Sequence, residues 1–274
     1  MPEAHHRTEP SHDVIVIGGS AGALAPLEQI LAALPRDLPA AIFVTLHLGA
    51  SSNLSEILSR HTALPVHAAA SGAPIERGHV YVAVSDRHLL LHDHHILLSR
   101  GPRENLARPA IDPLFRSAAC SFAGRVVGIV LSGHLNDGTA GLLAIKRCGG
   151  VAVVQDPTEA ACPDMATSAL RHVAIDHIVP ACDMAALLDQ LTRQPALEAP
   201  DIPFEIRFEA AIAAQELAGM ETNERLGELS PFACPECHGV LWEIDDGGLL
   251  RYRCHVGHAF TSETMHVEQG RRNE

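Results

Sequence analysis

The alternation of short apolar strands with helical patterns constrains the fold of this chain most strongly. Predicted strands, rich in Val and Ile, cover residues 13–17, 41–46, 126–131, 151–155 and 177–179. Predicted helices cover residues 23–34, 51–59, 113–122, 139–147, 164–171 and 184–191. Strands that alternate with helices form parallel βαβ units with right-handed crossovers. We therefore expect an α/β domain with a doubly wound, mostly parallel sheet. The segments HVYVAV, HLLLH and HILLSR predict short strands, and the last two predict a small β-hairpin insertion.

Composition supports this fold class and excludes several functions. Hydrophobic residues make up 47% of the chain and aromatic residues only 4%, so the core is expected to consist of Ala, Val, Ile and Leu. A net charge of −13 argues against non-specific nucleic-acid binding, which needs clustered Lys and Arg. No apolar stretch reaches the roughly 18–20 residues of a membrane span, and the N-terminus does not resemble a secretory signal. We therefore expect a cytoplasmic protein that is not embedded in a membrane.

The segment VIVIGGSAGAL at residues 14–24 raises two alternatives. A dinucleotide-binding turn needs G-x-G-x-x-G and an acidic residue about 20 positions later. Here Ser20 occupies the position where the backbone would approach the pyrophosphate, and the second strand is followed by His47. The sequence GGSAG also matches G-x-S-x-G, a turn that presents a serine nucleophile at the start of a helix. The second alternative is favoured.

Two further residues complete a candidate catalytic set. Ser20 follows the first strand and His47 follows the second, so a parallel sheet should make them neighbours. Imidazole is the usual base for a serine hydroxyl, and Asp137, in the loop SGHLNDG, can orient it. Each residue also has a structural alternative: a buried histidine for His47, and a helix N-cap for Asp137. The order Ser, His, Asp differs from that of α/β-hydrolases.

These residues resemble the CheB family of chemotaxis protein-glutamate methylesterases. The resemblance covers residues 13–191 and rests on the glycine-serine turn, the histidine after the second strand and the loop SGHLNDG, together with RPAIDPLFRSAA and GGVAVVQDPTEAACPDMATSAL. It implies that Ser20 is the nucleophile, His47 the base and Asp137 the orienting carboxylate. It also implies hydrolysis of γ-glutamyl methyl esters on a chemoreceptor-like protein, with release of methanol and no catalytic cofactor. Whether glutamine is also deamidated stays open.

The resemblance suggests further roles and shows departures. Backbone N–H groups of Ala21 and His134 are expected to hold the oxyanion, although His134 stands where the family usually has methionine. The loop residues Arg103, Asn105, Arg108 and Arg116 are expected to bind the substrate, or alternatively to be solvated. Only a dozen residues precede the first strand, so we expect a stand-alone catalytic domain without the receiver domain of other members. Expected partners are a methylated receptor-like substrate and a methyltransferase or sensor-kinase protein.

The C-terminal cysteines indicate a metal site. Cys234 and Cys237 form CPEC, and Cys254 and His258 lie in CHVGH. Three thiolates and one imidazole at this spacing are typical of a closed, structural Zn²⁺ site in a zinc ribbon. His255 is the alternative fourth ligand, and His258 is preferred.

The expected organisation has five parts. These are a disordered tail at 1–12, a catalytic domain at 13–193, a linker and helix at 194–230, a zinc-ribbon-like module at 231–262 and a second tail at 263–274. Within the linker and helix part we expect a helix over 205–229. The competing function is a non-catalytic signalling scaffold, in which the esterase-like domain reports to a partner through the zinc ribbon.

Overall fold

A seven-stranded parallel sheet forms the centre of the molecule. The structure is a computed structural model and describes residues 11–47, 53–196, 200–215 and 227–272. The strand order is β3-β4-β2-β1-β7-β8-β9. The strands are β1 (Val14–Gly19), β2 (Ala41–Leu46), β3 (Val66–Ala68), β4 (Val80–Val82), β7 (Val126–Val130), β8 (Val151–Gln155) and β9 (His177–Val179). The prediction of an α/β fold with a mostly parallel sheet is confirmed. The short strand β3 was not predicted.

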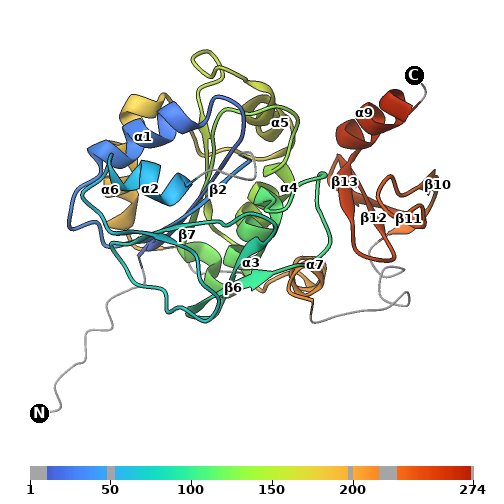
Figure 1. Cartoon of the computed structure of the whole chain (residues 1–274), viewed down its shortest axis with the longest axis horizontal. Helices are drawn as coiled ribbons and strands as arrows, with labels where there is room; N and C mark the ends of the chain where they lie inside the picture. Colours follow the sequence, from blue (N-terminus) through green and yellow to red (C-terminus); the bar gives the residue numbers. More distant parts are fainter. Residues whose placement is uncertain (1–10, 48–52, 197–199, 216–226, 273–274) are drawn as a thin grey trace, which may run out of the picture.

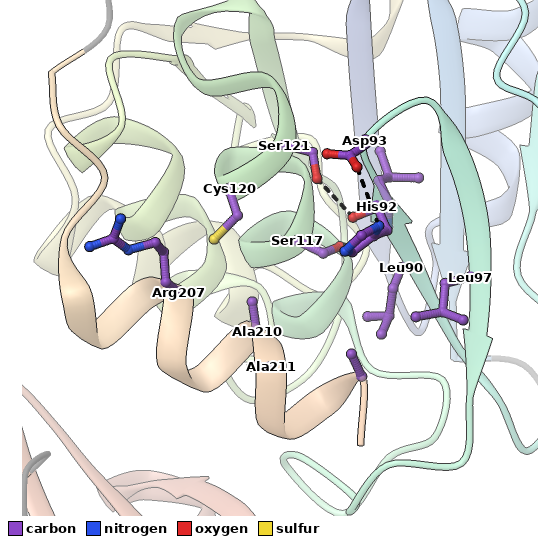
Figure 2. A pocket seen from close by; sticks show the side chains of 12 residues that line it. Leu90, His92, Asp93, Leu97, Ser117, Cys120, Ser121, Arg207, Ala210 and Ala211 are labelled. Atoms are coloured by element: carbon purple, nitrogen blue, oxygen red, sulfur yellow. Dashed lines mark hydrogen bonds and ion pairs between the residues drawn. The ribbon is translucent and has the colours of Figure 1, made fainter. Parts of the chain in front are cut away.

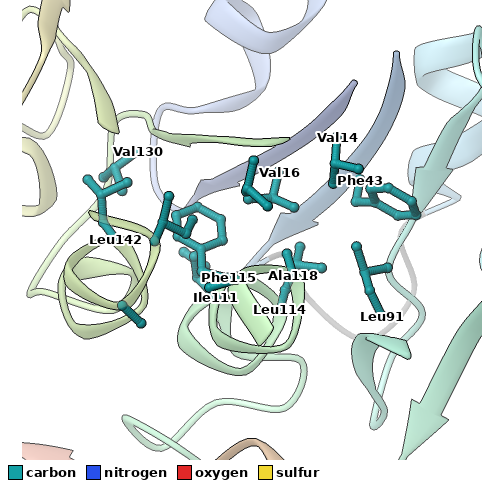
Figure 3. Packing of buried hydrophobic residues seen from close by; sticks show 14 of the residues in the cluster. Val14, Val16, Phe43, Leu91, Ile111, Leu114, Phe115, Ala118, Val130 and Leu142 are labelled. Carbon is teal, nitrogen blue, oxygen red and sulfur yellow. The ribbon is translucent and has the colours of Figure 1, made fainter. Parts of the chain in front are cut away.

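Helices cover both faces of this sheet (Figure 1). They are α1 (Leu24–Ala33), α2 (Leu54–Ser59), α3 (Ile111–Phe122), α4 (Thr139–Arg147), α5 (Asp164–His172) and α6 (Ala181–Thr192), with a short 3-10 turn at Ala123–Arg125. Strand residues alternate between two cores, since successive side chains point to opposite faces. Val14 and Val16 pack towards α3 and Ile111, as Figure 3 shows, whereas Ile15 and Ile17 pack with α1 and α6.

The predicted hairpin insertion is a separate two-stranded sheet. Strands β5 (His88–His92) and β6 (His95–Ser99) pair antiparallel, and β5 packs on α3. The backbone of Leu91 is tied to α3 because its N–H donates to Ser117 Oγ and its carbonyl accepts from Ser121 Oγ. The hairpin therefore covers the outer side of α3.

The C-terminal part differs from the predicted organisation. Helix α7 (Phe204–Ala213) is shorter than the helix expected over 205–229, and residues 216–226 lie outside the described part of the chain. The end of that expected helix is wrong: Glu228 and Leu229 belong to strand β10 (Glu228–Ala233) and pair with Glu243 and Trp242. Pairing with a neighbouring strand outweighed the helical pattern of the local sequence.

A small antiparallel sheet and a helix complete the chain. Strand β10 pairs with β11 (Val240–Asp246), followed by β12 (Leu249–Cys254) and β13 (Ala259–Thr261). Within the expected tail at 263–274, the described residues 263–272 are instead helical, since α9 spans Ser262–Arg272. Thr261 starts this helix, because its hydroxyl accepts the N–H of Thr264. Together β10–β13 and α9 form the C-terminal module, drawn in orange to red in Figure 1.

The N-terminal end of the described chain lies against the sheet domain. Residues 1–10 of the expected N-terminal tail lie outside the described residues, whereas Ser11 pairs with Pro195 and His12 is buried. Among the described helices, none is both long and apolar enough to cross a membrane.

Candidate active site and metal centre

Ser20 and His47 lie side by side where β1 and β2 end. The register pairs Gly19 with Leu46, and the N–H of His47 donates to the carbonyl of Gly19 at 3.1 Å. On the other side of β1, the N–H of Ser20 donates to the carbonyl of Ser132 at 2.9 Å. Ser20 is therefore held between the ends of both neighbouring strands, as expected for the carboxyl edge of a parallel sheet.

Small residues allow this close approach. A Cβ on Gly133 would overlap the sulfur of Met165 and lie 2.9 Å from Cβ of Ser20. Gly22 has a φ of +77°, a left-handed conformation that glycine adopts without strain, and a Cβ there would lie 2.8 Å from Ser132 Oγ. The turn after β1 is thus packed directly against the loop after β7.

His47 and Asp137 meet across the end of β1. Nε2 of His47 lies 2.9 Å from Oδ2 of Asp137, although the two residues follow strands on opposite sides of β1. The His47 side chain is 24% exposed and that of Asp137 only 4%. Since Nε2 faces the carboxylate, Nδ1 is the ring nitrogen through which His47 would act on Ser20.

Asp137 is anchored at the start of α3. Its carboxylate accepts the N–H of Ile111 at 2.7 Å, the N–H of Asp112 at 3.2 Å and the side-chain amide of Asn105 at 3.1 Å. Burial opposes ionisation of Asp137, but its contacts with His47, Ile111 and Asn105 outweigh burial and lower its pKa. An ionised carboxylate therefore faces the imidazole.

Asp137 does not cap α4, the helix that follows it; Asp112 does. Asp137 caps α3, whereas Oδ1 of Asp112 accepts the N–H groups of Gly138 and Gly141 at the start of α4. Burial, together with the neighbouring charge of Asp137, raises the pKa of Asp112 well above its ordinary value. Sequence reasoning did not single out Asp112, although it lies in the segment RPAIDP that was noted for the family resemblance.

The two residues expected to hold the oxyanion, Ala21 and His134, come from different loops. Ala21 follows the serine directly and is exposed. His134 lies in the loop after β7, and its ring turns towards α5, with Nδ1 3.1 Å from Asp164 Oδ2 and Nε2 3.4 Å from Cys162 Sγ. The role of their backbone N–H groups stays a prediction.

The four residues expected to bind substrate, three in a loop and Arg116 in α3, largely bind other groups of the protein. Arg116 is buried and donates to both carboxylate oxygens of Glu104, at 2.6 and 2.7 Å. Arg108 donates to Asp86 at 2.6 and 2.9 Å. These contacts do not favour a substrate-binding role for Arg116, whose guanidinium is not accessible.

The other two loop residues differ in exposure. Asn105 donates to Asp112 at 2.9 Å as well as to Asp137, so its amide is committed to the two carboxylates. Arg103 is exposed, and Nη1 lies 3.7 Å from Glu236 of the C-terminal module. Substrate contact by Arg103 stays a prediction.

Two cavities lie near the loops that carry His47 and Asp137. One of about 200 Å³ lies beside the end of β2, and its lining includes Leu46, Leu54, Val82 and Pro109. The other, of about 250 Å³, lies between the Asp137 loop, α5 and α9, and its lining includes Asn136, Asp164, Arg171 and Glu263. Most residues that line the first cavity are apolar, and most that line the second are polar or charged.

A third cavity, of about 320 Å³, lies between the hairpin, α3 and α7 (Figure 2). Its walls include Leu90, Leu97, Cys120, Arg207 and Ala210. Its lining does not include Ser20, His47 or Asp137. This cavity therefore does not belong to the candidate active site.

The structure groups the four predicted metal ligands. The ligand atoms of Cys234, Cys237, Cys254 and His258 all lie within 4.8 Å of one another. Cys237 Sγ is 3.6 Å from Cys254 Sγ, and His258 Nδ1 is 3.4 and 3.8 Å from the sulfurs of Cys254 and Cys234. With Zn–S bonds of about 2.3 Å, a tetrahedral site separates two sulfurs by roughly 3.8 Å. The spacing therefore fits a tetrahedral ion.

The alternative ligand, His255, lies elsewhere. A Cβ on Gly239 would overlap its ring, which therefore packs on the backbone of the knuckle. The group of residues that could hold a metal ion contains His258 and not His255.

The chain is similar to proteins of one family. The sequence model of the CheB methylesterase family matches residues 15–188. A protein-glutamate methylesterase/protein-glutamine glutaminase 2 of Anaeromyxobacter dehalogenans is 37% identical over 183 residues, which is 66% of this chain and 54% of the relative. A relative from Leptospira interrogans is 35% identical over 184 residues, which is 66% of this chain and 95% of the relative.

A solved structure is similar in fold. The crystal structure of the Thermotoga maritima CheB methylesterase catalytic domain matches with a TM-score of 0.63 at 29% identity, covering 65% of this chain and 98% of that chain. This chain thus spans about half the length of the Anaeromyxobacter relative and nearly all of the Thermotoga domain. The family match ends at residue 188 and does not include the C-terminal module.

Proposed function

Because the chain belongs to the CheB methylesterase family, we propose that it is a serine esterase that hydrolyses γ-glutamyl methyl esters on a chemoreceptor-like protein, within a chemosensory system. The observation that carries this proposal is the 2.9 Å contact between His47 and Asp137 across the end of β1, directly beside Ser20. A base, an orienting carboxylate and a serine at one strand edge are the parts that acyl transfer requires.

The reaction follows from these positions. Nδ1 of His47 takes the proton of Ser20 as Oγ attacks the ester carbonyl, and Asp137 stabilises the imidazolium that forms. The backbone N–H groups of Ala21 and His134 hold the oxyanion. Methanol leaves with the proton from His47. A water molecule then attacks the acyl carbonyl while His47 takes its proton; the bond to Oγ breaks, His47 returns the proton to Oγ of Ser20, and glutamate is released.

A second reaction uses the same groups. The Anaeromyxobacter relative is named as a glutaminase as well as a methylesterase. We propose that glutamine side chains are also substrates, with ammonia as the leaving group instead of methanol. The acyl-enzyme, and hence the product glutamate, is the same in both reactions.

We also propose that the Cys234, Cys237, Cys254 and His258 group binds one structural Zn²⁺. Four protein ligands fill a tetrahedral shell and leave no open position for a substrate, so the ion takes no part in the ester chemistry. Thiolate ligands need a reducing environment, which supports a cytoplasmic location. The catalytic part is then residues 13–193, and the zinc-ribbon-like part is residues 231–262.

We propose three partners for this chemistry. The substrate is a methylated receptor-like protein, and a methyltransferase must first supply its esters. A sensor kinase coupled to the same receptor is the further partner that we propose.

A serine-reactive fluorophosphonate probe tests the enzyme proposal. Native protein should be labelled at Ser20 and should release methanol from a peptide carrying a glutamate γ-methyl ester, whereas Ser20→Ala should do neither. Equal labelling of Ser20→Ala, or no labelling of native protein, would instead favour a non-catalytic signalling scaffold.

Metal analysis tests the zinc proposal separately. Purified protein should contain about one zinc per chain, and the double variant Cys234→Ser/Cys237→Ser should contain none. Folded native protein without metal would contradict the proposal.

A further inference from the structure

The C-terminal module contacts the loop that carries Asn105. The N–H of Asn105 donates to the carbonyl of Ala259 at 2.8 Å, and the N–H of Ala259 donates to the carbonyl of Arg103 at 3.3 Å. Glu104 and Ala259 form a parallel bridge. Strand β13 therefore pairs, through backbone hydrogen bonds, with the loop at residues 103–105 of the α/β domain.

Asn105 connects this strand to the candidate catalytic carboxylate. Its Oδ1 accepts the N–H of Thr261 at 3.2 Å, which leaves Nδ2 to donate to Asp137 and Asp112. A flipped amide would lose the bond from Thr261 and place an oxygen against two carboxylates. Asn105 also has a φ of +49°, a conformation that asparagine tolerates better than most residues. The module thus fixes the direction of the donor that binds Asp137.

The neighbour of Asp137 is held by the same part of the module. Asn136 is buried, and its Oδ1 accepts the hydroxyls of Thr261 at 2.7 Å and of Thr264 at 3.2 Å. Its Nδ2 donates to Glu263. Thr261, Glu263 and Thr264 all lie where β13 meets α9. Their hydrogen bonds hold Asn136, the residue directly before Asp137.

A buried ion network holds the module in place. Arg253, which is inaccessible to solvent, donates to Glu104 at 3.2 Å and to Glu209 of α7. Arg251 donates to Glu209 at 2.7 and 2.9 Å, and Arg116 of α3 donates to Glu104. Removing one partner of such a network would leave a buried, unpaired charge, so the module is held firmly against the α/β domain.

The metal ligands determine the path of β13. Cys254 ends β12 and His258 directly precedes β13, and between them the N–H of Cys254 donates to the carbonyl of His258 at 2.9 Å. Arg253 also donates to the carbonyl of Gly257 at 2.7 Å. An ion bound by Cys254 and His258 would therefore fix the turn between β12 and β13. This turn sets the position of Ala259 and Thr261, which contact Asn105.

We infer that the metal-held C-terminal module positions Asp137 for catalysis, with Thr261, Asn105 and Asn136 as positioning residues, and that metal occupancy thereby controls esterase turnover. This rests on the proposed esterase function. Among the described residues, the side-chain hydrogen bonds of the module reach Asn105 and Asn136 and not Ser20 or His47, so the module acts through the carboxylate of Asp137.

Kinetics of the full-length, zinc-loaded protein test this inference. Thr261→Val should lower kcat about 10- to 100-fold for methanol release from the γ-methyl-ester peptide, with KM changed less than about twofold, because small displacements of catalytic groups are costly. Thr261→Ser keeps the hydroxyl and should retain the native kcat. Thr192→Val is the matched control, since Thr192 is equally buried but bonds only to Asp189 at the end of α6.

A double-mutant cycle separates positioning from general damage. In an Asp137→Asn background, Thr261→Val should have little further effect on the rate of fluorophosphonate labelling, because the two residues act on one interaction. An equal fold-loss in both backgrounds would overturn the inference.

Hydrogen exchange gives a readout that does not depend on activity. The amides of Ile111 and Asp112, which donate to Asp137, should exchange faster in Thr261→Val and after treatment with a metal chelator, but not in Thr192→Val. An active esterase with unchanged exchange and unchanged kcat would overturn the positioning role alone. Faster exchange in a protein that does not react with the fluorophosphonate would support positioning and reject the proposed esterase.

Discussion

At the scale of single residues, Asp137 combines a structural and a proposed chemical role. One carboxylate contacts His47, accepts two backbone N–H groups at the start of α3 and accepts the amide of Asn105. Each of these contacts favours the ionised form, which outweighs the effect of burial on its pKa. The side chain is thus ionised and fixed in direction before any substrate binds.

Substituting Asp137 should affect the reaction far more than binding. In Asp137→Asn we expect kcat to fall about 10³- to 10⁴-fold, because an amide neither holds the ring tautomer nor stabilises the imidazolium. Methanol release at saturating γ-methyl-ester peptide measures this. Asp189→Asn, at an exposed ion pair with Arg193, is the control and should be neutral. A loss below tenfold would contradict the assigned role.

Gly133 is a second residue with a specific prediction. Gly133→Ala should destabilise the fold by about 1–3 kcal/mol and reduce labelling of Ser20, because the added Cβ meets Met165 and Ser20. Gly72→Ala is a useful comparison, since a Cβ there meets no atom within 4 Å. Gly72→Ala should also lose stability, because an alanine at a φ of +81° is strained. The two variants therefore differ in whether the new Cβ meets Ser20, and only Gly133→Ala should reduce the labelling of Ser20. Equal labelling of both variants would contradict the predicted contact.

At the scale of elements, α3 and α4 cap each other. Asp137 precedes α4 but accepts N–H groups of α3, and Asp112 of α3 accepts N–H groups at the start of α4. The sequence predicts only a cap of α4 by Asp137, because a capping partner on a distant helix has no local signal. This exchange explains how two helix starts and the candidate carboxylate are held in one arrangement.

Asp112→Ala should remove the cap of α4 and weaken the anchor of Asn105. We expect the free energy of unfolding to fall by about 1–3 kcal/mol, measured by urea denaturation. Asp183→Ala, in the first turn of α6, is the control, since α6 has no side-chain cap bond and should change little. An equal loss in the two variants would argue against a specific cap.

At the scale of the whole molecule, a buried ion network joins the α/β domain to the C-terminal module. Arg116, Arg251 and Arg253 face Glu104, Glu209 and Asp246. Burial raises the pKa of Glu209, but Arg251, Arg253 and Arg116 outweigh it and hold that pKa well below its ordinary value. The charges therefore balance across the interface only while both glutamates are ionised.

This network makes stability depend on acid. Because the pKa of Glu209 is lowered on folding, its contribution is complete above about pH 4.3 and is lost as the pH falls towards the folded-state value. Glu209→Gln should be less stable than native protein at pH 7, and the difference should shrink below about pH 4.3. Urea denaturation across this range measures it. A difference that stays constant with pH would contradict the assignment.

The sequence by itself determined the parallel α/β core, the hairpin, and the residue types at the strand ends, because periodicity and turn chemistry are local properties. It also grouped the four predicted metal ligands, because their spacing is local. Only the tertiary structure decided that residues 228–229 pair as a strand and that 262–272 form a helix. It also gave Asn105 and Arg116 protein partners instead of exposed surfaces. The strand and the buried partners depend on tertiary contacts, such as Leu229 with Trp242, Arg116 with Glu104 and Asn105 with Thr261, for which a single sequence carries no signal.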